Sequence, residues 1–235
     1  MASRVSASSA AFIAKGYLQL VARSASCRVG LDTGSSIEML SPGGTASTVA
    51  ELLGSPPTVF PLWNAHSLLL LTFYLGHTAV RNQSAYFQAV ADDSFGGLLT
   101  GQLFRQCGIQ WRQISYISPA KRLEDLKGLM RDRPHVIIAA DSHGPYRAIG
   151  PGMARLVKSY NGYVRPISLR CNKTLSLFRH IRMALPLPRS SIITVIGRPL
   201  ELETAHLSVL QIRECLESCL QNLELRTKAV HVPEA

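Results

Sequence analysis

The residues best placed to do chemistry lie in segment 141–147, which reads Asp-Ser-His-Gly-Pro-Tyr-Arg. An apolar, β-branched run, Val136–Ala140, precedes it and predicts a buried strand that ends at the acid. Open α/β sheets bind ligands in the loops beyond the carboxyl ends of their strands. Asp141 and His143 are therefore candidate catalytic groups; the alternative is an ordinary strand-to-helix connection that Asp141 caps. The same loop supplies four candidate substrate-binding residues: Ser142, Gly144, Pro145 and Arg147.

A second polar segment, Asn64–Ser67, also follows a predicted strand, Thr58–Trp63, and precedes an apolar block. It contains His66, and an imidazole is the side chain that most often accepts a proton near neutral pH. His66 is therefore a candidate general base and Asn64 a candidate substrate-binding residue. The alternative for His66 is a structural or merely polar role in the loop. The leucines at 68–71 fit either the core or the wall of an apolar channel.

Alternating strands and helices, with no internal repeat, surround these two polar segments. This order predicts an α/β fold with a largely parallel central sheet flanked by helices. We expect residues 170–189 to form a basic, irregular insert. The other expected strands are 37–40, 78–80, 109–117, 163–169 and 191–196, and the expected helices are 46–53, 68–76, 98–107, one that starts at 118, 153–158 and 204–227.

The N-terminal part of the chain differs in composition from the rest. Residues 6–27 combine apolar and basic residues, which is typical of an amphipathic helix that lies on a membrane surface or on the domain; a plain packed helix is the alternative. Lys15 and Gln19 interrupt its apolar centre, which argues against a cleaved signal peptide. We divide the chain into a membrane-proximal segment, 1–54, and an α/β domain, 55–235.

The chain is strongly basic. Lysines and arginines number 25 against 15 acidic residues, a formal net charge of +10. Such a charge favours anionic partners: lipid head groups, phosphate-bearing substrates, acyl carrier proteins or nucleic acid. Because no long basic run is present and only 7% of residues are aromatic, a dedicated nucleic-acid reader is disfavoured.

The five cysteines are scattered and odd in number, which indicates a reducing compartment. Cys215 and Cys219 share one face of a predicted helix, but no second pair completes a zinc site, so we expect no metal. The sequence contains no run of eighteen or more apolar residues, so we do not expect a membrane-spanning helix.

Five blocks of the chain together carry a family resemblance: Leu62–Leu69, Gly108 with Arg112–Ser115, Asp141–Pro145 with Gly150–Gly152, Val164–Ile167, and Gly197–Leu200. In this order and spacing, residues 60–225 resemble the glycerolipid, or lysophospholipid, acyltransferase superfamily. They are most similar to a poorly characterised bacterial branch of it. No single block is specific to this superfamily, but the shared order and spacing of the blocks are.

The resemblance implies a fold, a reaction and a set of roles. In the family a histidine is the general base on the acceptor hydroxyl, a carboxylate orients it, and an arginine and the glycine-rich loop hold the acceptor phosphate. Arg112 and Ser115 match the arginine block, so both become candidate substrate-binding residues. The co-substrate would be an acyl-CoA or acyl-carrier-protein thioester, with no bound cofactor, and the acceptor a phospholipid, lysolipid or lipid-linked hydroxyl. We expect peripheral association with the cytoplasmic face of the inner or plasma membrane.

The sequence also departs from the family. Asn64 stands where the branch has its histidine, Leu70 where the wider family has an acid after it, and Gly96 where the branch has another acid. If His66 replaces the base, Asp92, Asp93 or Asp141 would have to orient it. A catalytically degenerate lipid-binding or scaffold protein of the same fold is therefore the rival hypothesis. A hydrolase that uses Ser142 or Ser67 is disfavoured because neither lies in a Gly-x-Ser-x-Gly elbow.

Overall fold

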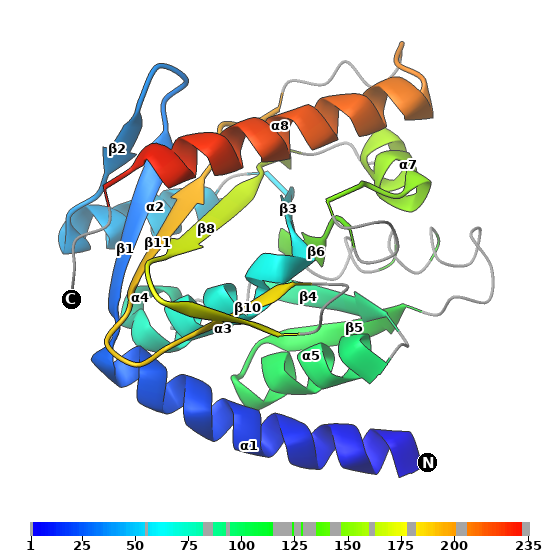
Figure 1. The fold of residues 1–235 in the computed structure, drawn as a ribbon. Coiled ribbons are helices and arrows are strands. Elements are labelled where there is room, and N and C mark those ends of the chain that lie inside the picture. The colour runs from blue at the N-terminus through cyan, green and yellow to red at the C-terminus, as the bar shows by residue number, and fades with distance from the viewer. Residues whose placement is uncertain are drawn as a thin grey trace.

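The computed structural model is an α/β protein with two main sheets and a separate hairpin (Figure 1). It describes residues 2–54, 56–81, 87–92, 95–114, 124, 128, 135–141, 147–159, 163–177, 182–200 and 206–231.

A five-stranded sheet in the order β5-β4-β6-β3-β7 is parallel throughout, as the alternating pattern predicted. All five residues of β3, which lies between β6 and β7, are buried. Proline has no N–H to donate to a neighbouring strand. Pro61 is tolerated because this position faces β7, and β3 pairs with β7 only at Thr58 and Val59. The strands are β3 (Thr58–Leu62), β4 (Phe87–Asp92), β5 (Gln110–Ile114), β6 (His135–Ala139) and β7 (Tyr163–Val164).

The second sheet has four strands in the order β2-β1-β11-β8 and mixes parallel and antiparallel pairs. Its strand β1 pairs in parallel with β11, with Ser26 opposite Ser191. The first 54 residues therefore supply β1 and β2 to a sheet whose other strands come from the far end of the chain. The strands are β1 (Ser26–Asp32), β2 (Ile37–Met39), β8 (Ile167–Cys171) and β11 (Ser191–Ile196).

Three expectations for strands were wrong. Residues Thr78–Arg81 form a helix, α4, and the strand of that region is β4, which the sequence analysis missed. The predicted strand 163–169 is two strands, β7 and β8, which separate at Pro166 and enter different sheets. The insert 170–189 is not irregular throughout, since β9 (Thr174–Leu177) and β10 (Met183–Pro186) form an antiparallel hairpin. The helix that was expected to start at residue 118 falls outside the described residues, except for positions 124 and 128.

The N-terminal helix α1 (Ala2–Ser24) packs one face on α3 (Ser67–Gly76) and α5 (Phe95–Gln106) and leaves its other face open. Alanines and aliphatic residues form its buried face, whereas Phe12, Ile13 and Leu20 are exposed. Figure 1 shows α1 along one side of the molecule and the last helix, α8, across the opposite side. Among the described residues, no helix has the length and apolar character to cross a membrane.

Local signals explain where the helices end and begin. Gly108 follows α5 at a φ of 89°, and its N–H and that of Ile109 bond back to Arg105 and Phe104, a Schellman ending that favours glycine. Helix α8 (Val209–Ala229) begins with a capping box between Ser208 and Gln211. Two further helices lie within the described residues, α2 (Pro42–Gly54) and α7 (Pro151–Ser159), and α7 packs against α8.

Candidate active site

Asp141 lies just beyond β6, at the carboxyl edge of the parallel sheet. Its Oδ1 accepts a hydrogen bond from the Asn64 N–H at 2.7 Å, and its Oδ2 accepts one from the Arg147 N–H at 3.1 Å. Asp141 is buried, and this burial raises the pKa of its carboxyl group, although the two backbone donors act in the opposite direction. The side chain therefore ties together the two polar loops that the sequence analysis singled out.

His66 lies at the end of a short 3₁₀ helix (Asn64–His66) that joins β3 to α3. It is only 6% exposed, and its Nδ1 accepts the N–H of Leu169 in β8 at 3.4 Å. Burial, followed by the nearby charges of Arg147 and Lys228, lowers the pKa of His66 to about 3. The imidazole is therefore neutral near pH 7, with its proton on Nε2 and its lone-pair nitrogen turned to the backbone of β8.

Asn64 and Ser67 lie next to this histidine. The Ser67 hydroxyl is buried and donates to Asn64 Oδ1 at 3.3 Å. The Asn64 side chain thus helps to hold the turn from which α3 starts, while its backbone N–H holds Asp141. A role for Asn64 in binding substrate stays a prediction.

Arg147 connects the Asp141 loop to the C-terminal helix. Its backbone adopts a φ of 63°, a left-handed conformation that is uncommon for a residue other than glycine. Its guanidinium pairs with Glu224 of α8, and Lys228 Nζ lies 2.9 Å from the same Glu224 oxygen. The sequence analysis missed Glu224 and Lys228. The available signal was an acid inside the buried stripe of α8, beside Leu220, Leu223 and Thr227.

Arg112 lies elsewhere on the sheet. It is exposed on the edge strand β5, where it pairs with Val90, which in turn pairs with Ile138 of β6. Strand β4 therefore lies between β5 and β6, which puts Arg112 roughly 10 Å from Ile138 across the sheet. Asp141 lies three residues beyond Ile138 in the sequence. The assignment of Arg112 to an anion site stays a prediction. Five other candidates fall outside the described residues: Ser115, Ser142, His143, Gly144 and Pro145.

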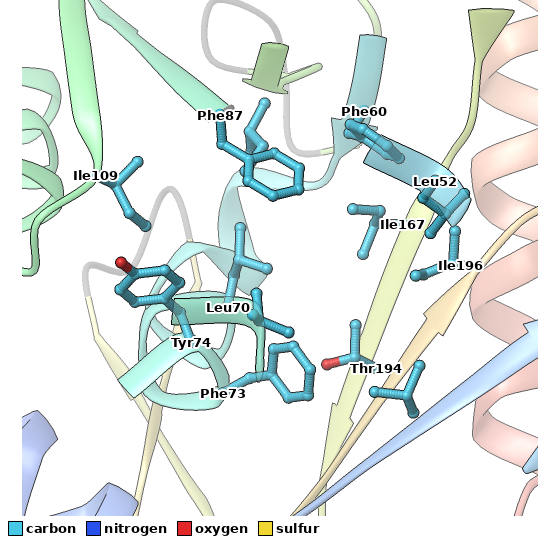
Figure 2. Close-up of a pocket in the computed structure, with 13 residues that line it drawn as sticks. Leu52, Phe60, Leu70, Phe73, Tyr74, Phe87, Ile109, Ile167, Thr194 and Ile196 are labelled. Atoms are coloured by element: carbon cyan, nitrogen blue, oxygen red, sulfur yellow. The ribbon is translucent and has the colours of Figure 1, made fainter. Parts of the chain in front are cut away.

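An apolar pocket lies between the two sheets (Figure 2). Its cavity volume is about 70 Å³, smaller than the roughly 300–1,000 Å³ typical of sites for drug-sized ligands. Phe60 and Ile137 face it from the parallel sheet, Ile167 and Ile196 from the second sheet, and Leu70 from α3. The cavity therefore offers an apolar group a site of its own within the fold.

The pocket and the polar residues share one helix face. Leu70, Phe73 and Tyr74 line the pocket, and they follow His66 by four, seven and eight residues. Because residues with this spacing lie on one side of a helix, His66 stands about one turn, roughly 5.4 Å, before the pocket wall. The leucine block 68–71 contributes Leu70 to the pocket and Leu71 to the core beside α1.

In the part of the chain that the structure describes, no three His, Cys, Asp or Glu side chains gather as they would around a metal ion.

Comparison with known proteins bears on the fold. No protein-family model matches this sequence, and no curated protein sequence matches it. The structure is similar to the crystal structure of the 1-acyl-sn-glycerophosphate (LPA) acyltransferase, PlsC, from Thermotoga maritima, with a TM-score of 0.51 and 11% sequence identity. The match covers 94% of this chain and 81% of that chain. At this identity the similarity is one of fold, and it agrees with the α/β architecture expected from the sequence.

Proposed function

We propose that this protein is an acyltransferase that moves a fatty acyl group from a thioester donor to a hydroxyl of a lysophospholipid-like or lipid-linked acceptor. The observation that carries the proposal is the apolar pocket, whose wall begins at Leu70, about one helical turn after His66. The apolar lining suits the methylene groups of a fatty acyl chain, and a cavity of about 70 Å³ would hold one part of such a chain. The fold similarity to an acyltransferase supports the same reaction.

The proposed reaction needs a base and no redox change. The acceptor oxygen attacks the thioester carbonyl carbon, the C–S bond breaks, and the hydroxyl proton passes through the base to the departing thiolate. The products are an ester and a free thiol. The donor is an acyl-CoA or an acyl carrier protein thioester, whose anionic groups suit a protein of net charge +10.

We assign the base to His143, which follows Asp141 by two residues in the sequence. His66 is the less favourable candidate because a group with a pKa of about 3 binds a proton weakly at pH 7. In addition, the acceptor nitrogen of His66 already receives the N–H of Leu169. In this proposal His66 shapes the wall between the pocket and the polar loops.

The test is acyl transfer from radiolabelled acyl-CoA and acyl carrier protein to a set of lysophospholipids. We expect His143→Ala to lower the rate about 100- to 10,000-fold, the usual contribution of a general base, and His66→Gln to lower it far less. His206→Ala, at an exposed histidine, is the matched control. If His66→Gln alone loses acyl transfer while its stability is unchanged, His66 and not His143 is the general base.

A second candidate function, a catalytically degenerate lipid-binding or scaffold protein, is favoured by the buried, neutral state of His66 and by Asn64 in the usual histidine position. It predicts binding of fatty acyl chains in the pocket without turnover. Absence of label transfer from both donors, together with acyl-chain binding by the wild type, would overturn the acyltransferase proposal in its favour.

We further propose that the protein lies on the cytoplasmic face of the inner or plasma membrane as a peripheral protein. Two observations support this location: the exposed Phe12, Ile13 and Leu20 of α1, and the positive net charge. An exposed apolar helix face next to basic residues is suited to the head-group region of an anionic leaflet.

A further inference from the structure

The β9–β10 hairpin carries two exposed leucines on one of its faces. Leu175 of β9 is 54% exposed, and Leu187, directly after β10, is 37% exposed. Leu185 stands opposite Leu175, and the Leu187 N–H bonds to the Lys173 carbonyl, which continues the same register. Because alternate residues of a strand share a face, the three leucines point to one side of the hairpin. Leu185 packs on the apolar cluster that α1 shares with α3 and α5, so the exposed leucines lie beside that contact.

Helix α1 brings exposed apolar residues to the same place. Ile13, Tyr17 and Leu20 are spaced by four and three residues, so they lie along one side of the helix. The Tyr17 hydroxyl donates to the Pro186 carbonyl of β10 at 3.0 Å, and Ile13 and Leu20 are exposed on either side of it. The two elements therefore form one apolar surface, the α1–hairpin patch, made of Ile13, Leu20, Leu175 and Leu187.

Basic side chains border this patch where the end of α1 meets the hairpin. The Arg189 N–H donates to Ser24 Oγ at 3.1 Å, which fixes the end of α1 to the chain that leaves β10 (Figure 1). Arg23, Lys173 and Arg189 are all exposed. The apolar patch therefore has cations along one of its ends.

The segments that build the patch contain no acid. Residues 2–31 have four lysines and arginines, residues 167–200 have six, and neither segment has an aspartate or a glutamate. Exposed apolar side chains next to cations suit the head-group region of an anionic bilayer, because the apolar groups enter the acyl boundary and the cations meet the phosphates. Since the apolar side chains project from a helix and a hairpin, a fluid lipid surface is the partner that fits them.

The hairpin also reaches the candidate active site. Strand β10 contacts both α3 and the 3₁₀ helix Asn64–His66. A bilayer bound to the α1–hairpin patch would therefore lie on the side of the molecule from which β10 leads to the polar loops.

We propose that the β9–β10 hairpin is a membrane-contact element, which binds an anionic bilayer jointly with α1 through the α1–hairpin patch. The inference rests on the proposed peripheral location and adds the element that fixes how the protein lies on the membrane. A helix alone can roll on a surface, whereas a helix and a hairpin joined by two hydrogen bonds define one orientation. In this orientation a lipid acceptor reaches the candidate site from the bilayer, past the hairpin.

The first test places a fluorescent reporter on the hairpin. We expect the emission of Leu175→Trp to shift to the blue on vesicles of phosphatidylglycerol and phosphatidylcholine, and to be quenched when the lipids carry brominated acyl chains. Leu210→Trp, at an exposed leucine of α8, is the matched control and should respond to neither. The two native tryptophans are the same in both variants. Emission of Leu175→Trp that does not respond, while the protein sediments with the vesicles, would overturn the proposal.

The second test removes the contact. We expect Leu175→Ser with Leu187→Ser to weaken partitioning onto anionic vesicles about tenfold at unchanged thermal stability, because both side chains are exposed in the free protein. Lys173→Gln should weaken it about fivefold, and only on anionic vesicles. Arg213→Gln on α8 is the charge control and should have little effect. Wild-type partitioning of the leucine variant, with equal weakening by Lys173→Gln and Arg213→Gln, would show only a general charge effect and would overturn the patch.

These outcomes separate the inference from the proposed function, because vesicle binding is measured without a thioester donor and does not depend on acyl transfer. A wild type that binds no vesicles would reject the peripheral location and the hairpin contact together. Vesicle binding that is lost on substitution of the α1 residues but kept in the leucine variant would reject the hairpin alone. Binding of acyl carrier protein that the leucine variant loses, with vesicle binding intact, would overturn the proposal in favour of a carrier-protein surface.

Discussion

His66 is stabilised in its neutral form, so its contribution to stability depends on pH. The pKa of His66 is lowered from 6.5 to about 3 on folding, and the unfolded chain therefore binds more protons between these values. The free energy of unfolding must then fall as the pH falls from 6.5 toward 3, and the contribution is fully present above 6.5. Asp141 acts oppositely at lower pH, because its raised pKa favours the folded state in acid.

We expect the free energy of unfolding to fall by about 2 kcal/mol between pH 7 and pH 5 on account of His66. His66→Gln should lose most of this dependence even if it is less stable at every pH. The measurement is urea denaturation at several pH values, with His206→Gln as an exposed histidine control. A pH dependence in His66→Gln as steep as that of the wild type would contradict the buried, neutral histidine.

The sequence pattern pointed to Asp141, but it did not predict the surroundings of His66 or the nearby residues Glu224 and Lys228. Asp141 was identified because a charge that ends a β-branched strand is a strong local signal, and the structure puts it between the two polar loops. The environment of His66 could not be predicted because β8, which buries it, lies about 100 residues away. Glu224 and Lys228 were missed for the same reason, since only tertiary packing brings the end of α8 to Arg147.

Helix α5 lies unusually close to the sheet it covers. A Cβ added to Gly101 would come 2.4 Å from the ring of Trp111 in β5, whereas a Cβ on Gly16 of α1 would meet no atom within 4 Å. Gly101 is therefore needed for close contact between helix and strand, while Gly16 only costs the helix conformational entropy.

We expect Gly101→Ala to lower the free energy of unfolding by about 1–3 kcal/mol through overpacking. Gly16→Ala, the matched control in a helix with an open face, should raise it by roughly 0.5–1 kcal/mol. Urea denaturation midpoints of the two variants measure both effects. Shifts of the same sign would contradict the packing of α5 on β5.

Elements with strong, continuous patterns were predicted from sequence, and weaker ones were not. The apolar runs of β3, β6 and β11 are local signals and lie where they were expected, and so does the leucine stripe of α8, although that helix begins at Val209 and not at residue 204. β9 was missed because it has only four residues: its Thr-Leu-Ser-Leu sequence alternates as a strand should, but the first three residues are exposed and contribute nothing to a core. The division of 163–169 between two sheets depends on pairing partners that the local sequence does not specify.

At the scale of the whole molecule, α1 and α8 offer a paired test of membrane binding. Both helices carry exposed apolar residues, but they lie on opposite sides of the fold (Figure 1). The open face of α1 has three such residues with Arg23 nearby, and α8 has Leu210 and Leu225.

We expect the triple substitution of Phe12, Ile13 and Leu20 by serine to weaken partitioning onto anionic vesicles at least about tenfold, because each buried apolar side chain contributes on the order of 1–2 kcal/mol. Leu210→Ser with Leu225→Ser should leave partitioning unchanged. Vesicle sedimentation at low and high salt measures both effects, and high salt should release the wild type. Equal binding by the two variants would reject α1 as the membrane-facing element.

The parallel pairing of β1 with β11 joins residues that are 165 positions apart, from Ser26 to Ser191. At roughly 5–20 residues per second, a ribosome needs on the order of 10–30 s to deliver the second strand after the first. The last strand of the five-stranded sheet ends at Val164, so its strands can pair while β1 still has an unpaired edge, before α8 arrives to cover Val59 and Val164. We expect this long-range closure to make the second sheet form late, and the edge of β1 to be open to aggregation until β11 pairs with it.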